Sequence, residues 1–427
     1  MLDRTLSPEI QNVSKPDYIE PECLKLNNGI KIYATRAGRE EMMRIDWVFC
    51  AGSWFQKKAL TANLTCAMLQ TGSAKYSSKE IAEIFDFHGA YIQTSCAHHQ
   101  AVVSLICLKK HLESLLPVVE DFIKHPSFPE KEFRTLIARR KQRFSVDMEK
   151  VKVICQKTFA QTLFGNAHPY NAGVKMEDFN QITRADIQAF YPKHYHAQNC
   201  EIQLVGQYDS ETSYLLSQHF GGDDWLGEAS QEQSFDLPSN PKSLVKVHKE
   251  GAIQSAIRVG KIMLDNQHPD YFDLKITIAL LGGYFGSRLM KNIREEKGYT
   301  YGIGAGYVNN LRTSYFLIST EVAKQYEEDT LNEIYLEIER LQHELVSDDE
   351  LNTLKQYLMG EFLRSFDGAF QQLATFRYLH NFKLNYKYYD QYFQRMANIT
   401  AEDIRQVACK YLNVESLTTV VVGNEQE

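Results

Sequence analysis

The chain has 427 residues, too many for one hydrophobic core, so we expect two domains of about 200 residues each. Apolar residues make up 44% and charged residues 24% of the sequence, as is typical of a soluble globular protein. A net charge of −7 argues against a nucleic-acid partner. The longest uncharged stretch near the middle, Ile276 to Ser287, is far shorter than the roughly 20 residues of a membrane span, so we expect no membrane association.

The cysteines predict a reducing environment. All eight are scattered, no Cys-x-x-Cys pair occurs, and several lie in apolar runs such as Leu105 to Leu108. This usage is typical of buried thiols rather than of a disulfide framework. The N-terminus, Met1 to Arg4, does not begin a basic-then-apolar signal segment. Together these features predict a cytoplasmic protein.

The first half of the chain begins with strands and continues with helices. Asn28-Gly29 predicts a hairpin within residues 26–34, and a strand follows at Arg44–Ala51. A helix is expected at Ser78–His88, followed by an alternating strand at Ile92–Leu108. Amphipathic patterns then predict helices at Leu112–Lys124, Glu130–Glu149 and Val153–Phe164.

Three features of this half invite other readings. The basic stretch Arg134–Arg143 is interpreted as a solvated or cavity-facing helix surface rather than a nucleic-acid site. His98 and His99 suggest a metal site, but neighbours on a strand point to opposite faces and cannot share one ion, so a structural role is favoured. The helical spacing of His194 and His196 likewise sends those two side chains apart.

The second half repeats the order of the first. Strands are expected near Ile257–Leu264, Tyr301–Val308 and Ser314–Glu321, and helices at Glu327–Leu345 and Asp348–Arg364. Strands followed by a block of helices predict an α+β fold, in which helices cover an antiparallel-rich sheet.

An internal repeat relates the two halves. The segment Ile182–Ile187 (ITRADI) recurs 217 residues later as Ile399–Ile404 (ITAEDI), and in both copies a threonine is placed to cap a helix. The strands that end at Gly206 and Gly423 have the same offset. A period of half the chain predicts two homologous α/β-sandwich domains. The polar segment at residues 227–241 separates them, so we place the domains at residues 1–228 and 242–427.

One string in the second half resembles a known family signature. Residues 281–289 (LGGYFGSRL) and 292–301 (NIREEKGYTY) are similar to the second-domain signature of the insulinase (pitrilysin/insulin-degrading-enzyme) family of zinc peptidases. The resemblance implies that Arg294 and Tyr301, seven residues apart, stabilise a developing oxyanion, and that Gly282 and Gly283 help to bind substrate.

The same resemblance locates a zinc motif that this chain lacks. Family members carry His-x-x-Glu-His on the helix that follows a Gly-Ser turn, and a further Glu ligand downstream. Asn63 and Ala67 stand at the histidine positions, Cys66 at the Glu position, and the third ligand should fall near Gln142, where four cations and no carboxylate occur. This donor set does not suit zinc, so we expect no metal and no other cofactor in this chain.

A degenerate zinc motif beside an intact Arg/Tyr pair implies a particular role within the family. The resemblance suggests the non-catalytic subunit of a processing-peptidase-like heterodimer, which completes the chamber for a peptide or an unfolded polypeptide. Its partner would be a homologous subunit that bears His-x-x-Glu-His. Two alternatives remain open, a homodimeric peptide-binding scaffold without a protease partner and a zinc peptidase active by itself. Whether the chain is an enzyme is therefore uncertain at this point.

Overall fold

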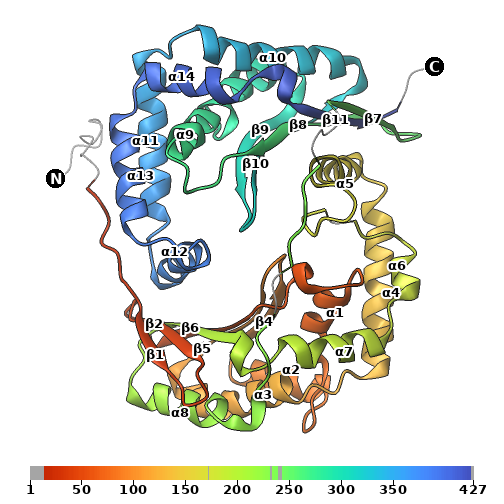
Figure 1. The fold of residues 1–427 in the computed structure, drawn as a ribbon, viewed down its shortest axis with the longest axis vertical. Coiled ribbons are helices and arrows are strands. Elements are labelled where there is room, and N and C mark those ends of the chain that lie inside the picture. The colour runs from red at the N-terminus through yellow and green to blue at the C-terminus, as the bar shows by residue number, and fades with distance from the viewer. Residues whose placement is uncertain (1–13, 172, 231–232, 239–242, 425–427) are drawn as a thin grey trace, which may run out of the picture.

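The computed structural model describes residues 14–171, 173–230, 233–238 and 243–424. Two halves, each built on one β-sheet, are stacked along the long axis of the molecule (Figure 1). The first sheet has the order β1-β2-β6-β3-β5-β4 and the second the order β7-β11-β8-β10-β9. The strands of the first sheet are β1 (Glu22–Lys25), β2 (Lys31–Thr35), β3 (Met42–Phe49), β4 (Tyr91–Cys96), β5 (Ala101–Leu108) and β6 (Cys200–Gly206). Those of the second are β7 (Leu244–His248), β8 (Gln254–Met263), β9 (Thr300–Asn309), β10 (Ser314–Ala323) and β11 (Thr418–Gly423).

The two sheets share one topology. In each half the last strand, β6 or β11, pairs parallel with β2 or β7. Lys31 of β2 lies opposite Glu201 of β6, and Leu244 of β7 lies opposite Thr419 of β11. The same closing strand pairs antiparallel with the next strand, β3 or β8, and every remaining pair is antiparallel. The expected α+β fold with antiparallel-rich sheets is confirmed. The domain boundaries themselves stay a prediction, since residues 231–232 and 239–242 lie outside the described chain.

The helices repeat as well. Helix α7 (Arg184–His194) and helix α14 (Ala401–Tyr411) both begin with a capping box, in which Thr183 or Thr400 accepts from the backbone N–H of an aspartate three residues later. The first half also contains α1 (Thr61–Met68), α2 (Ser78–Phe87), α3 (Leu112–Lys124), α4 (Glu130–Asp147), α5 (Val151–Phe164), α6 (Asp178–Gln181) and α8 (Ser210–Phe220). The second contains α9 (Tyr271–Gly282), α10 (Glu327–His343), α11 (Asp348–Arg364), α12 (Ala369–Asn381) and α13 (Lys387–Asn398).

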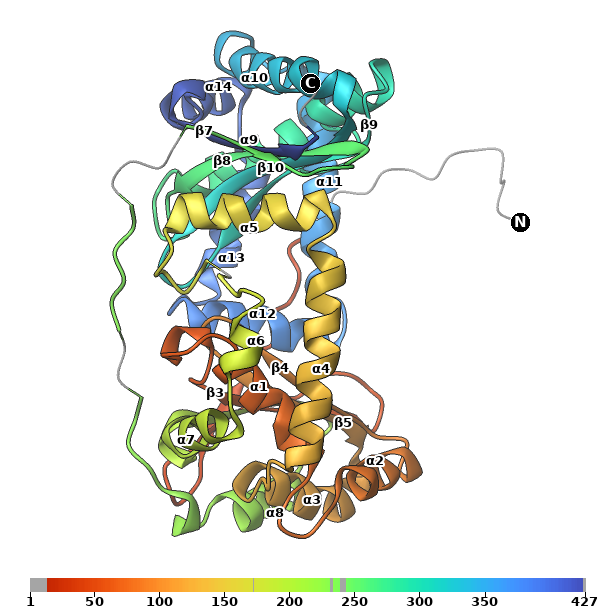
Figure 2. The same ribbon diagram turned by 90° about the vertical axis from the view of Figure 1, so that its right-hand side faces the viewer.

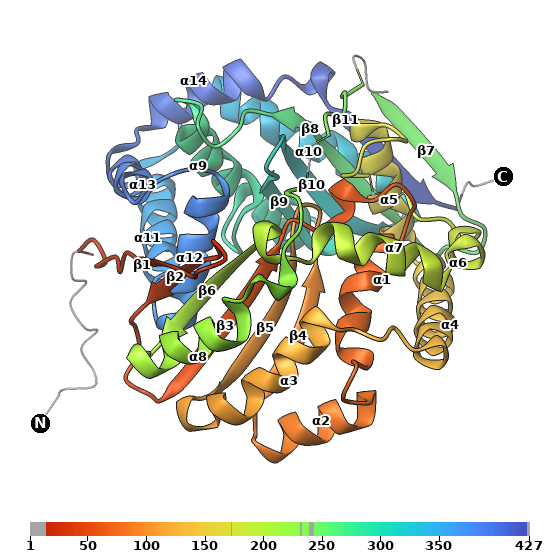
Figure 3. The ribbon, with the colours of Figure 1, turned by 60° about the horizontal axis from the view of Figure 1, so that its bottom comes forward.

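Each sheet buries one face against helices of its own half. In the first half, Trp47 and Phe49 of β3 pack with Phe122 of α3 and Phe220 of α8 in one apolar core. Figure 3 shows these helices in front of the first sheet. The second half has a separate core of the same kind. Alternating side chains on half-buried strands account for this layering.

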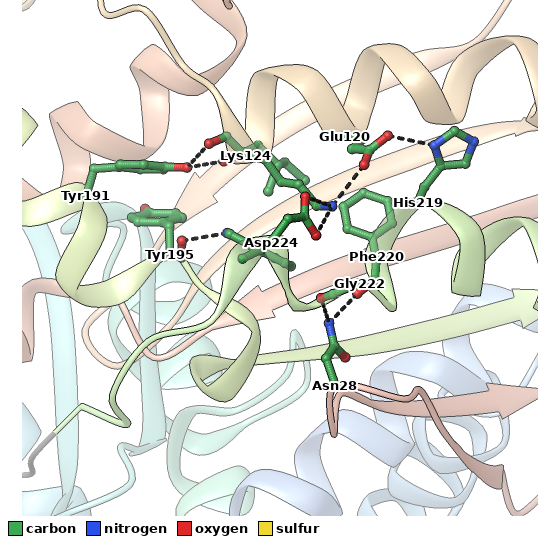
Figure 4. A network of polar contacts seen from close by, with 11 residues as sticks. Asn28, Glu120, Lys124, Tyr191, Tyr195, His219, Phe220, Gly222 and Asp224 are labelled. Atoms are coloured by element: carbon green, nitrogen blue, oxygen red, sulfur yellow. Dashed lines mark hydrogen bonds and ion pairs between the residues drawn. The ribbon is translucent and has the colours of Figure 1, made fainter.

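A buried lysine ties the end of the first half to its helix layer (Figure 4). The Lys124 ammonium is almost completely buried and donates to Glu120 at 2.9 Å and to Asp224 at 3.0 Å. Burial alone would raise the pKa of Glu120, but hydrogen bonds from His219 and Lys124 hold that pKa below its usual range. The Asn28 amide also donates to the carbonyls of Phe220 and Gly222, which joins the first hairpin to this network.

The opposite face of each sheet is covered by a helix from the other half. Helix α5 packs on the second sheet, where Phe159 and Leu163 join Val420 and Val422 of β11 in one apolar cluster. Helix α12 packs on the first sheet, with Phe376 beside Val205 of β6. Figures 1 and 2 show α5 under the upper sheet and α12 over the lower one. Because α5 and α12 occupy equivalent positions in the repeat, the two halves exchange corresponding helices.

Polar contacts fix α12 on the first sheet. Arg377 donates to Gln203 at 2.6 Å and pairs with Asp46, a fully buried carboxylate of β3 that Arg44 also contacts at 3.0 Å. One helical turn along, His380 lies 2.8 Å from the carboxylate of Glu201. Charge pairs in this interface therefore specify where the exchanged helix lies.

The predicted strand at Ile92–Leu108 is wrong in one respect, since it is a hairpin of β4 and β5 rather than a single strand. Ala97 donates to the carbonyl of Gln100 at 2.8 Å and closes the turn that separates the two strands. His98 and His99 therefore lie in a turn, and their rings contact the same tyrosine, Tyr170. Alternation of apolar and polar residues continues through the turn and so does not reveal it. Helix α7 ends at His194, so His196 lies beyond the helix on which it was expected.

Candidate functional site

The residues at the expected zinc positions lie on α1, and an arginine from α4 faces them. The Arg140 guanidinium donates to Oδ1 of Asn63. Cys66, one turn along α1, is buried, and its thiol donates to the carbonyl of Ser95 at 3.2 Å. Burial raises the pKa of Cys66 to about 12, so the group is a thiol rather than a thiolate at neutral pH. Ala67 offers no donor atom at all.

The residue that α4 brings to this place is Arg140 rather than Gln142. Gln142 is exposed on the same helix, and a separation of two residues on a helix turns a side chain away from its neighbour. Burial, and after it the charge of Arg139, lowers the pKa of Arg140. The sequence showed a cationic stretch here, but not which of its members turns towards α1.

These residues do not fit a zinc ion. Zinc sites use three or four thiolate, imidazole or carboxylate ligands, whereas this place offers one amide, one thiol and a permanent cation. Among the residues that the structure describes, no group of three or more His, Cys, Asp and Glu side chains lies close enough to hold a metal. The guanidinium stands where a dication would have to be held.

Arg294 is presented by a π-helix, η6 (Met290–Glu296). The wide turn of η6 is fixed from behind by buried Asn292, whose amide donates to Glu337 at 2.7 Å and to Glu333 at 2.9 Å on α10. Ahead of it, Arg288 makes a bidentate pair with Glu350 of α11, with both distances at 2.9 Å. Single π-turns of this kind often place side chains at functional sites.

Tyr301 projects from a β-bulge at the start of β9. The register against β10 shifts between Thr320 and Val322, so that the partners of these two residues, Ile303 and Thr300, lie three apart on β9. The Thr320 hydroxyl bonds both the Thr300 hydroxyl at 2.9 Å and the Gly302 carbonyl at 3.0 Å, which holds the bulge in place. As a result, the Tyr301 side chain is 93% exposed. Bulges re-aim side chains in this way beside active sites.

The guanidinium of Arg294 lies between two exposed aromatic rings. Its central carbon is 4.7 Å from the ring centroid of Phe285 and 5.5 Å from that of Tyr301. Phe285 is 62% exposed. In the described part of the chain, Arg294 makes no ion pair, and this holds for its sequence neighbours Glu295 and Glu296 as well. We call Phe285, Arg294 and Tyr301 the Arg/aromatic triad.

Phe285 was not identified from the sequence as a site residue. It lies within the family string, nine residues before Arg294, and only the fold brings its ring over the guanidinium. The sequence offered one signal for Phe285, its position inside a Gly-rich turn, because large apolar side chains are seldom placed there without a partner.

Tyr301 also lines a pocket of about 290 Å³, which opens between α5 and the second sheet and includes Lys152, Arg258 and Glu321.

The two glycines of the family string occupy different environments. Gly282 is buried, and a Cβ atom there would lie 2.5 Å from the backbone nitrogen of Ala305, so this glycine allows α9 to approach β9 closely. Gly283 is exposed at the end of α9. A substrate-binding role for the pair stays a prediction.

Among the described residues, no hydrogen bond or ring contact joins the Arg/aromatic triad to the Asn63–Arg140 group.

Comparison with known proteins gives two adjacent family matches. Residues 34–170 match the model described as insulinase (peptidase family M16), and residues 181–358 match the peptidase M16 inactive domain. A solved structure from Pseudomonas fluorescens, titled as a peptidase M16 inactive domain, superimposes with a TM-score of 0.83 at 23% identity. The alignment covers 95% of this chain and 98% of that one.

Three curated relatives carry different descriptions. An uncharacterized zinc protease of Rickettsia bellii is 22% identical over 93% of this chain and 96% of its own length. The non-peptidase homolog YmxG of Helicobacter pylori is 20% identical over 88% and 87%. Subunit alpha-1 of the mitochondrial-processing peptidase of Dictyostelium discoideum is 24% identical over 47% of this chain and 31% of its own.

The histidine spacing separates this chain from an active zinc peptidase of the family. No two of its 13 histidines lie four residues apart, so the sequence nowhere contains His-x-x-Glu-His. With both family models matched in order and the fold shared, the chain belongs to the insulinase family, peptidase family M16, as a member without that motif.

Proposed function

We propose that this chain is the non-catalytic subunit of a two-subunit peptidase, and that it lends the Arg/aromatic triad to the zinc centre of a homologous partner. The observation that carries the proposal is the guanidinium of Arg294, held between two exposed rings without a carboxylate partner in the described chain. A cation that the fold positions and leaves unneutralised suits an anion supplied from outside. The similarity to a mitochondrial-processing peptidase alpha subunit, part of a multi-subunit enzyme by its name, supports the same role.

The chemistry of the triad suits peptide hydrolysis in a partner's site. Attack on a peptide carbonyl develops an oxyanion, which a fixed guanidinium and a phenol O–H stabilise more strongly than they stabilise the neutral carbonyl. The two aromatic rings limit the rotamers of Arg294 before substrate arrives, so less ordering is required in the transition state. The partner supplies the zinc-bound water, and this chain supplies donors only.

An extended polypeptide has a place to bind in the first half. Strand β4 is the edge strand of its sheet, and Tyr91 and Gln93 are exposed along it, before Ser95, whose carbonyl accepts from Cys66. Unpaired backbone groups at such an edge can accept a further strand from a peptide. We therefore take peptides or unfolded polypeptides as the substrate class. We also propose a cytoplasmic location, which is supported by four buried free cysteines, as in proteins of reducing compartments.

The test is a reconstituted complex with a chain from the same source that carries His-x-x-Glu-His. We expect Arg294→Ala to lower kcat on a quenched fluorescent peptide by about 100-fold, the loss usual for one oxyanion donor, while the complex still assembles. The matched control is Arg134→Ala, at an exposed arginine on α4 that pairs with Glu130, which should leave kcat unchanged.

Three results contradict the proposal. Full turnover by the Arg294→Ala complex would leave the chain as a scaffold. A stable homodimer that excludes every zinc-bearing partner would favour the homodimeric peptide-binding protein. Peptide cleavage by this chain alone, lost on chelation and restored by zinc, would make it a zinc peptidase active by itself.

A further inference from the structure

A tyrosine-rich pocket in the second half has no role in the function proposed above. It has a volume of about 440 Å³ and lies between α9, β9, α11, α12 and α13. Seven tyrosines line it, and the lining includes none of the Arg/aromatic triad. A volume of this order suits a small organic molecule or one or two residues of a peptide.

The pocket contains one ammonium group without a counter-ion. Lys275 of α9 places its amine 4.2 Å from the centroid of the Tyr392 ring. Within the described residues, this amine makes neither a hydrogen bond nor an ion pair. Lys275 is half-buried, whereas Lys124 is buried and has two carboxylates around its amine. Burial lowers the pKa of Lys275 to about 8, and the ring face of Tyr392 compensates only part of the lost hydration.

Several of the other polar groups of the pocket already have partners. The Tyr271 hydroxyl accepts from Asn309 at 2.6 Å, and the Tyr389 hydroxyl donates to the carbonyl of Thr375 at 3.2 Å. The Tyr378 hydroxyl accepts from Asn266 at 2.9 Å. The carboxylate in the lining, Glu361, pairs with Arg364 of its own helix. A ligand therefore meets apolar ring faces, the hydroxyls of Tyr357 and Tyr392, for which the described residues provide no hydrogen bond, and one cation without a counter-ion.

We propose that this pocket binds a carboxylate carried on an apolar or aromatic body, with Lys275 as the group that receives the carboxylate. An ammonium removed from water is costly to leave unpaired, and an incoming carboxylate repays that cost. The ring faces around it accept an aromatic or aliphatic group. Two sources share this chemistry, the C-terminal carboxylate of a peptide and a free aryl or alkyl acid.

Calorimetric titration of the full chain at pH 7 tests the proposal with paired probes. The acids are Ala-Ala-Phe with a free C-terminus and N-acetylphenylalanine, and each has its neutral amide as the counterpart. We expect at least one acid to bind, its amide to bind about tenfold or more weakly, and Lys275→Met to abolish the difference. Lys131→Met, at an exposed lysine of α4, is the matched control and should bind like the unchanged chain.

The outcomes distinguish the two ligand sources from each other and from a failure of the proposal. Binding of the tripeptide acid alone points to peptide C-termini, and binding of both acids, or of the smaller one alone, points to free acids. Affinity should fall between pH 7 and pH 9.5, as the amine loses its proton. Equal affinity for acid and amide, no binding of either acid, or unchanged binding by a folded Lys275→Met variant would overturn the proposal. None of these results depends on a partner subunit, so the function proposed above can stand or fall separately.

Discussion

At the scale of single residues, two groups that contain residues singled out by the family resemblance differ in how each uses a cation. The Asn63–Arg140 pair brings a permanent cation to the place where a metal would be held. The Arg/aromatic triad has kept a cation and left it without a carboxylate. The first group is thus occupied by the chain's own cation, while the cation of the second group is open to an anion from outside the described chain.

We expect the purified chain to hold far less than one zinc ion per molecule, because Arg140 repels the dication and the ligands are absent. Elemental analysis after purification without metal-affinity resin measures this. The triple change Asn63→His, Ala67→His and Arg140→Glu supplies two imidazoles and a carboxylate and should raise the zinc content towards one per chain. Stoichiometric zinc in the unchanged protein, lost on Asn63→Ala, would refute the reading of this site.

Tyr301→Phe should lower the turnover of the reconstituted complex by less than Arg294→Ala does. The change removes the phenol O–H but keeps the ring that packs on the guanidinium and removes no charge. Peptide turnover and thermal unfolding should be measured on the same preparations. Since the ring is 93% exposed, the unfolding temperature should not move. Equal losses of activity and stability would indicate a purely structural tyrosine.

At the scale of helices and strands, the molecule is organised by the exchange of α5 and α12. Each helix covers a sheet that belongs to the other half, and the polar part of the contact is concentrated on Asp46 and Arg377. The fully buried Asp46 carboxylate depends on arginines from both halves. This pair therefore reports directly on whether the exchanged helix is docked.

Arg377→Met should destabilise the protein by about 3 kcal/mol, the lower end for breaking a buried ion pair, because Arg44 still contacts Asp46. Urea unfolding followed by circular dichroism measures the loss. The control is Arg143→Met, at an exposed arginine 3.7 Å from Asp147, which should change the free energy of unfolding by less than about 0.5 kcal/mol. Equal effects of the two changes would mean that the Asp46 contact does not hold α12.

The elements show what local pattern can and cannot predict. Helices at Leu112–Lys124 and Asp348–Arg364 were predicted with the observed bounds, since amphipathic period and caps are local properties. The turn at residues 97–100 was missed because Gly52 makes it possible from a distance: a Cβ there would lie 2.2 Å from the His98 carbonyl. The exchange of α5 and α12 was not predicted either, because the apolar stripe of a helix does not determine which of two sheets the helix covers. In the same way the string around Arg294 was recognised, whereas Phe285 and Arg140 depended on tertiary packing.

At the scale of the whole molecule, three histidines lie where the halves meet. His98 and His99, in the β4–β5 turn, and His168 surround Tyr170, whose hydroxyl bonds His99 at 2.7 Å and accepts from the backbone N–H of Arg312 in the second half at 3.0 Å. Burial lowers the pKa of all three, and for His99 to about 4, with further lowering from His98, Arg312 and His168. Folding therefore favours the neutral form of these rings.

The sign of the resulting pH dependence follows from linkage. A histidine whose pKa is depressed by folding binds its proton more readily when unfolded, so stability is complete above about pH 6.5 and falls as the pH drops towards about 4. We expect the unfolding temperature to decrease over this interval, with a smaller decrease in His99→Asn. His125→Asn, at an exposed histidine, is the control and should keep the full dependence. A His99→Asn protein with an unaltered pH profile would refute this account.

The exchanged helices also bear on how the chain is made. Phe159 and Leu163 of α5 find their apolar partners on β11, and Cys155 bonds the carbonyl of Val420, 265 residues further on. A ribosome that adds 5–20 residues per second, a typical rate, needs roughly 10–50 seconds to cover that distance. For that interval the apolar side of α5 lacks its partners on β11, although the first sheet is complete as soon as β6 has been made. The nascent chain thus exposes an apolar helix surface until β11 emerges, and this is the stage at which a chaperone would be needed most.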